Sequence, residues 1–85
     1  MEREITQIDE MQRYALKFGR EILEDITRVY PSSQKCREDC RILDEEIRSA
    51  SKLLDLMGEC DPITVQVMGN LVRLNGIMSE KYRRI

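Results

Sequence analysis

Apolar residues recur every three or four positions along almost the whole chain, and this spacing leaves few folds open to it. The period places apolar side chains on one face of an α-helix, whereas a half-buried strand alternates every second residue. The pattern is interrupted near Pro31 and again near Gly58. We therefore expect an all-α protein of one domain, residues 1–85, with helices at about residues 5–30, 33–57 and 62–84.

The first predicted helix carries one apolar stripe and ends before Pro31, because the residue before a proline is pushed out of helical geometry. The second has a strict alternation of steps of four and three, which predicts a narrow coiled-coil-like seam ending at Gly58. The two stripes are Ile5, Ile8, Met11, Ala15, Phe18, Ile22, Ile26 and Val29, and then Cys36, Cys40, Leu43, Ile47, Ala50, Leu54 and Met57.

The third predicted helix begins with a strong start signal and then carries apolar residues on two sides. Asp61 is a good capping residue, and Pro62 at the first helical position lacks only an amide that would be unpaired anyway. The expected core face is Ile63, Val67, Leu71, Leu74, Met78, Tyr82 and Ile85. The second side holds Val65, Met68, Gly69, Val72 and Gly76.

This second side is the predicted partner-binding surface. Gly69 and Gly76 share it, although each glycine costs about 1 kcal/mol of helix stability relative to alanine, and close approach of another backbone would explain them. Two interpretations stay open, because a neighbouring helix of the same bundle could cover this side as well as a partner protein could.

The connections between the predicted helices are only a few residues long, which makes consecutive helices antiparallel neighbours. We therefore expect an antiparallel three-helix bundle. The alternative is a long helical hairpin that completes its core by dimerising, because a narrow seam suits a two-helix contact as well.

The composition argues against metal binding and against catalysis. The chain has no histidine, and its three cysteines fit a reducing compartment better than a disulfide framework. Cys36 and Cys40 are one turn apart, but Cys60 lies about 30 Å away by helical rise, so we predict no metal site and no cofactor. Carboxylates are plentiful without marking a pocket, and no phosphate-binding loop or nucleophile–base pair appears, so we expect no enzyme.

The charge pattern bears on partners and on location. A net charge of −2 argues against a dedicated nucleic-acid binder, although Arg73, Lys81, Arg83 and Arg84 form a candidate basic patch. No apolar run approaches the length of a membrane span, and the first residues lack a signal-peptide core. We expect a cytoplasmic protein that does not bind a membrane.

These features together predict a non-enzymatic protein–protein interaction module. We expect a small regulator or inhibitor, of the kind that phages and mobile elements also encode, which occludes a partner protein through a helical face and forms homo-oligomers. The alternative is a nucleic-acid-associated regulator that uses the basic patch.

Overall fold

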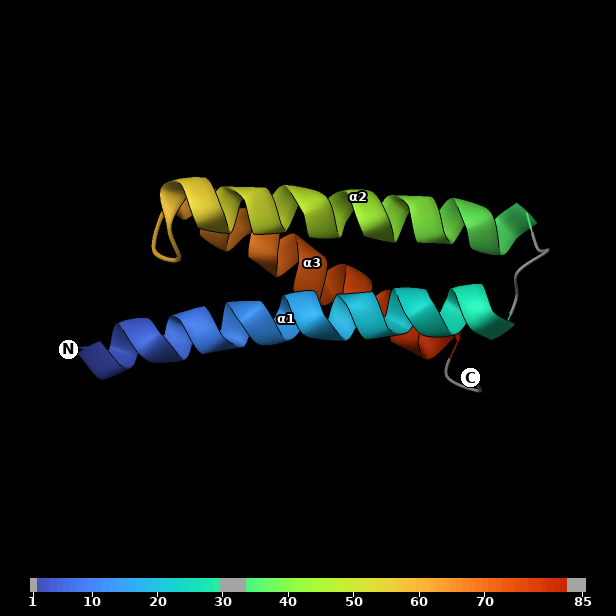
Figure 1. The fold of residues 1–85 in the computed structure, drawn as a ribbon, viewed down its shortest axis with the longest axis horizontal. Coiled ribbons are helices and arrows are strands. Elements are labelled where there is room, and N and C mark those ends of the chain that lie inside the picture. Colours follow the sequence, from blue (N-terminus) through green and yellow to red (C-terminus); the bar gives the residue numbers. More distant parts are fainter. Residues whose placement is uncertain (1, 30–33, 83–85) are drawn as a thin grey trace.

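The computed structural model describes residues 2–29 and 34–82, with side chains described from residue 7 onward. Its elements are α1 (Glu2–Val29), α2 (Gln34–Met57) and α3 (Pro62–Lys81), and the described residues contain no strand. Consecutive helices run in opposite directions, and each of the three packs against the other two (Figure 1). The predicted all-α three-helix bundle is confirmed.

The turn between α2 and α3 is built from the residues that the sequence marks for it. Gly58 has a φ of 89°, in the left-handed region that favours glycine, and its N–H donates to the Leu54 carbonyl at 3.0 Å. Asp61 caps α3, because its Oδ1 accepts from the Ile63 N–H at 2.9 Å. The other predicted turn, at Pro31 to Ser33, lies outside the described residues.

One cluster of buried apolar side chains lies between the three helices. The α2 seam contributes as expected, apart from an exposed Met57 and a half-buried Cys40. The cluster consists of Ala15, Leu16, Ile22 and Ile26 from α1, Cys36, Leu43, Ile47, Ala50 and Leu54 from α2, and Met68, Leu71 and Met78 from α3.

The buried face of α3 differs from the predicted one by part of a turn. Ile63 was expected in the core but is 50% exposed, whereas Thr64 and Asn75 are buried. Thr64 Oγ1 donates to the Leu53 carbonyl at 3.3 Å, and Asn75 Nδ2 donates to the Ala15 carbonyl at 2.9 Å. Because Thr64 Oγ1 and Asn75 Nδ2 have partners, these side chains can be buried, and they take positions that apolar periodicity assigns to the surface. The buried Asn75 Oδ1 has no hydrogen-bond partner among the described residues.

The buried face of α1 is shifted in the same way. Met11, expected in the core stripe, is 71% exposed, while its neighbour Gln12 is buried. Gln12 Nε2 donates to the Glu59 carbonyl in the turn between α2 and α3, at 2.9 Å. This hydrogen bond turns Gln12 inward and leaves Met11 on the edge of α1 that lies beside α3.

The described end of α3 also differs from the prediction. The helix ends at Lys81, and Tyr82 follows as its C-cap, with its N–H donating to the Met78 carbonyl at 2.9 Å. The remaining residues of the predicted helix, and Ile85 of its predicted core face, lie outside the described residues.

Candidate functional site

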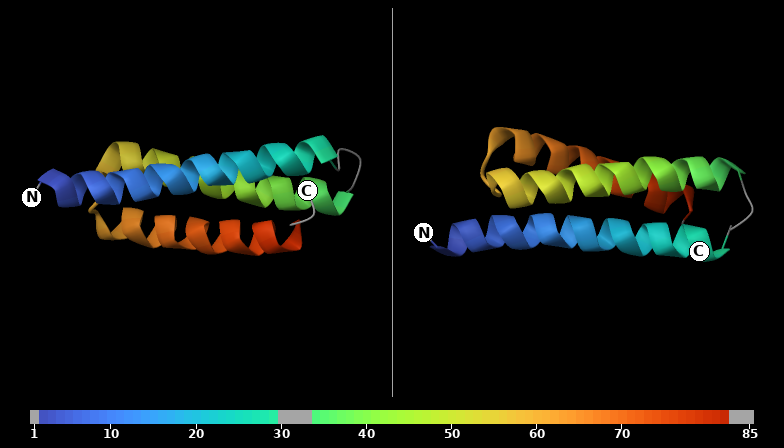
Figure 2. Two further views of the ribbon diagram at one scale, coloured as in Figure 1. Left: turned by 90° about the horizontal axis from the view of Figure 1, so that it is seen from below. Right: turned by 45° about the horizontal axis from the view of Figure 1, so that its top comes forward.

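An apolar groove runs along the side of the bundle where α1 and α3 lie next to each other in parallel, with α2 behind them (Figure 2, left). It consists of two adjoining depressions of about 650 and 320 Å³, which share Met11, Ala15 and Val72. We call this the α1–α3 groove. Its walls are Ile8, Met11, Tyr14 and Phe18 on α1, and Val65, Gly69, Val72 and Gly76 on α3.

The walls of the α1–α3 groove expose large apolar side chains next to one another. Met11 is 71% exposed, Tyr14 66% and Val72 57%, and the Tyr14 and Phe18 rings stack with centroids 6.0 Å apart. Single exposed apolar residues are normal, but contiguous ones that line a depression mark a binding surface. Among the described side chains that line the two depressions, Glu10 is the one that carries a charge.

The structure separates the five predicted partner-binding residues into two groups. Val65, Gly69, Val72 and Gly76 lie at the surface, along the α3 wall of the groove. Met68 belongs to the hydrophobic core and is only 4% exposed, so that it contributes to the floor of the smaller depression.

The two groove glycines have open space around them. A Cβ placed on Gly69 or on Gly76 would meet no heavy atom within 4 Å, so no neighbouring helix of the chain makes the close approach expected there. The crowded glycine is Gly19 on α1, where a Cβ would lie 3.0 Å from Asn75 Oδ1 and 3.2 Å from Ile47. No part of the described chain therefore fills the space beside Gly69 and Gly76.

The α1 wall is the half of the groove that the sequence analysis missed. Met11 and Phe18 were assigned to the core stripe, and Tyr14 was assigned to no surface. The signal was present, because Met11, Tyr14 and Phe18 follow one another at steps of three and four and so form a second stripe on α1.

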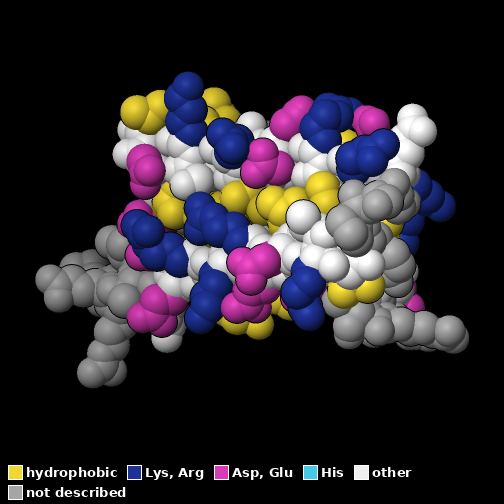
Figure 3. Space-filling model, turned by 45° about the vertical axis from the view of Figure 1, so that its right-hand side comes forward, with side chains coloured by type: hydrophobic (Ala, Val, Ile, Leu, Met, Phe, Trp, Pro, Cys, Tyr) yellow, Lys and Arg dark blue, Asp and Glu magenta, His cyan; other side chains and the backbone are white. Residues whose placement is uncertain are grey.

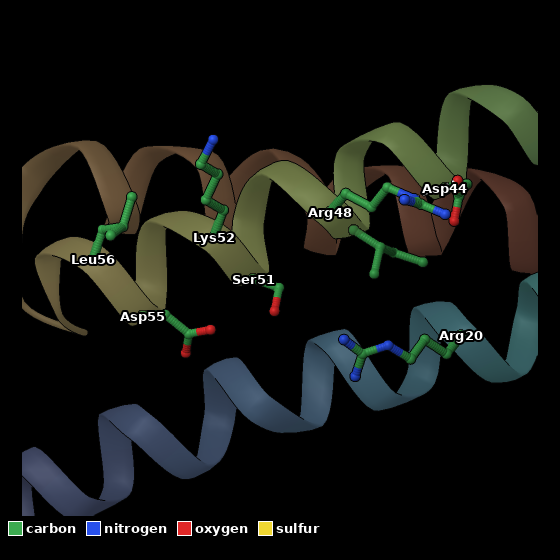
Figure 4. A pocket seen from close by; sticks show the side chains of 8 residues that line it. Arg20, Asp44, Arg48, Ser51, Lys52, Asp55 and Leu56 are labelled. Atoms are coloured by element: carbon green, nitrogen blue, oxygen red, sulfur yellow. Dashed lines mark hydrogen bonds and ion pairs between the residues drawn. The ribbon is translucent and has the colours of Figure 1, made fainter.

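A third depression lies between α1 and α2, outside the α1–α3 groove, and is polar where the groove is apolar (Figure 4). Its volume is about 690 Å³, and charged side chains dominate its lining. Arg48 Nε lies 2.8 Å from Asp44 Oδ2, while Lys52 points away from α1. Basic and acidic side chains are interspersed on the neighbouring surface as well (Figure 3), which is typical of a solvated face.

The candidate basic patch is only partly within the described residues. Arg83 and Arg84 lie outside them. Lys81 Nζ lies 2.7 Å from Asp39 Oδ2 on α2, and the Tyr82 hydroxyl donates to the same oxygen. Arg73 lies eight residues before Lys81, about 12 Å along the helix, and is exposed. Of the two described residues of the patch, Lys81 is thus held in a contact between α2 and α3.

The contacts at Asp39 shift the pKa values of Asp39 and of Tyr82. Burial by itself raises the pKa of Asp39, but the hydrogen bonds from Lys81 and Tyr82 outweigh burial and hold it below its usual value. Burial, and then the hydrogen bond to Asp39, raise the pKa of Tyr82 far above its usual value. At neutral pH the contact therefore consists of a carboxylate with an ammonium and a phenol donor.

The three cysteines are free and differ in their exposure. Cys36 is buried near the start of α2, Cys40 is half-buried, and Cys60 is exposed in the turn before α3. Within residues 7–29 and 34–82, no three His, Cys, Asp or Glu side chains lie close enough together to hold a metal ion.

Comparisons with known proteins identify no relative of this chain. No protein family, no curated protein and no solved structure matches the chain. Of the helices in the described part of the chain, none has the length and apolarity needed to cross a membrane.

Proposed function

We propose that this chain is a non-enzymatic protein–protein interaction module whose binding surface is the α1–α3 groove. The observation that carries the proposal is the row of exposed apolar side chains along both walls, with Met11, Tyr14 and Val72 each more than half exposed. Burial of apolar area drives most protein association, and aromatic residues and methionine are enriched at the centres of such interfaces.

The shape of the α1–α3 groove favours a helix as the bound element. Its two walls are neighbouring parallel helices, and the notches at Gly69 and Gly76 lie seven residues apart, which is two helical turns. A helix packed along the groove would insert its apolar side chains at these notches.

Photo-cross-linking in cells that produce the protein tests this proposal. A benzophenone amino acid replaces Val72 in one variant and, as the control, Lys52 in another, because both positions are exposed and Lys52 belongs to the charged α1–α2 depression. We expect a protein adduct of one defined mass from position 72 and none from position 52.

A second substitution in the position-72 variant checks that the adduct depends on the groove. The Cβ of Gly69→Leu meets no heavy atom within 4 Å, so the protein should keep its helicity, while the larger side chain fills the notch and the adduct should be lost. The absence of any adduct from position 72, or the same adducts from both positions, would refute the proposal.

A further inference from the structure

We propose that the protein bound in the α1–α3 groove is a second copy of this chain, related to the first by a two-fold axis. This inference rests on the proposed function, and it names the partner of the same surface. In a two-fold dimer the same patch is used by both copies, so the patch must be complementary to itself. The α1–α3 groove meets this condition in shape and in charge.

The two walls of the groove differ in shape, and each suits the other. The α1 wall projects, because Met11 and Tyr14 are 71% and 66% exposed. The α3 wall carries the exposed side chains of Val65 and Val72 and has gaps at Gly69 and Gly76, whose Cβ positions have no neighbour within 4 Å. The projecting side chains and the notches therefore belong to one patch, as a self-complementary surface requires.

A two-fold axis through the middle of the groove brings these unlike walls together. Since α1 and α3 run in the same direction, rotation about an axis perpendicular to them turns the second copy end to end (Figures 1 and 2). It places α1 of the second copy across α3 of the first, antiparallel, and α3 of the second copy across α1. Met11 and Tyr14 of each copy then face the glycine wall of the other.

Two exposed charged residues fit the same arrangement, Glu10 in the groove lining and Arg73, which follows Val72 in the sequence. Glu10 lies before the middle of the α1 segment of the groove, residues 7–18, and Arg73 lies after the middle of the α3 segment, residues 65–76. Neither has an ion-pair partner among the described residues. The rotation exchanges the two ends, so Glu10 of each copy comes to the level of Arg73 of the other and forms an ion pair twice.

The net charge of the chain also permits self-association. At −2 per chain, the repulsion between two copies is small compared with that between strongly charged proteins. A foreign helix would have to supply apolar side chains and a matching charge pattern independently. A second copy supplies both through symmetry.

Charge reversal tests the inference, because a two-fold pairing predicts an unusual rescue. Glu10→Arg and Arg73→Glu are made as separate variants, and both positions are exposed, so that each variant should fold like the wild type by circular dichroism. Alone, each variant places like charges together twice, and we expect its self-association to weaken about tenfold at low ionic strength. In an equimolar mixture, the heterodimer contains two pairs of opposite charge.

Sedimentation velocity should therefore show that the mixture, and also the chain carrying both substitutions, regain association within about threefold of the wild type. A mixture that associates no better than its components, or a wild-type chain that stays monomeric at every concentration, would overturn the inference. In that second case, an adduct of position 72 with a different protein would leave the proposed function standing. If position 72 gave no adduct, the proposed function would fail as well.

Discussion

Asn75 joins α3 to α1 beside Gly19, a residue of α1. Its Nδ2 donates to the Ala15 carbonyl at 2.9 Å, and its buried Oδ1 lies against Gly19. A polar side chain in this position fixes how far the two helices approach and how α3 is rotated, because an apolar side chain could slide past the carbonyl at little cost. Asn75 also lines the larger depression of the groove.

Glycine-to-alanine substitutions test this close contact. Gly19→Ala places a methyl group 3.0 Å from Asn75 Oδ1 and 3.2 Å from buried Ile47, so the free energy of unfolding should fall by about 1–3 kcal/mol despite the higher helix propensity of alanine. Gly76→Ala is the matched control at a protein concentration low enough for the chain to be monomeric, because its Cβ meets nothing within the chain, and it should raise the unfolding free energy by up to about 1 kcal/mol. Urea unfolding at one protein concentration measures both. Equal stabilisation by the two substitutions would show that Gly19 is not closely packed.

Among the elements, α2 could be predicted closely and α3 only in part. The seam of α2 stands out in the sequence because one side is apolar and the other charged, so the pattern identifies the buried face. In α3 apolar residues occur on most of the circumference, and the buried face is set by the hydrogen bonds of Thr64 and Asn75 to carbonyls of other helices. Such partners are brought together only by the fold, and no spacing within α3 indicates them.

The contact of Asp39 with Lys81 and Tyr82 ties the start of α2 to the end of α3 and makes stability depend on pH. Because the pKa of Asp39 is lower in the folded protein than in the unfolded chain, its carboxylate stabilises the fold at pH values above the unfolded pKa of about 3.9. That contribution disappears as the pH falls through the folded pKa, which lies below the unfolded one.

Asp39→Asn should therefore lower the unfolding free energy at pH 7 by about 1–3 kcal/mol and reduce its further loss below about pH 4. Asp44→Asn is the control, since this carboxylate belongs to an exposed pair with Arg48 on the same helix, and its effect should stay within about 1 kcal/mol. Urea unfolding between pH 2 and pH 7 gives both profiles. A profile for Asp39→Asn that runs parallel to that of the wild type would contradict the role of this contact.

For the whole molecule, the number, order and direction of the helices could be read from the sequence, because short connections and helical periodicity leave few arrangements. The groove could be predicted only from its α3 wall. The stripe of Met11, Tyr14 and Phe18 on α1 is visible in the sequence, but whether it lies at the surface depends on the rotation of α1. Gln12 fixes that rotation through the Glu59 carbonyl, 47 residues away in the chain. A surface made by two helices appears in a sequence only once both rotations are known.

The central claim is that the Val65–Gly76 side of α3 faces a partner, while the adjacent Met68 holds the core together. Light scattering on Val72→Glu and on the wild type tests this claim most directly. Met68→Ala is measured beside them, with its free energy of unfolding taken from urea unfolding. Met68→Ala should lose about 2–5 kcal/mol of unfolding free energy, because its side chain is buried.

We expect the wild type to reach twice the 10.0 kDa mass of one chain, and Val72→Glu to remain helical with the mass of a single chain. An unfolded Val72→Glu would mean that this side of α3 belongs to the core. A folded Val72→Glu with the same mass as an associated wild type would mean that the association uses another surface.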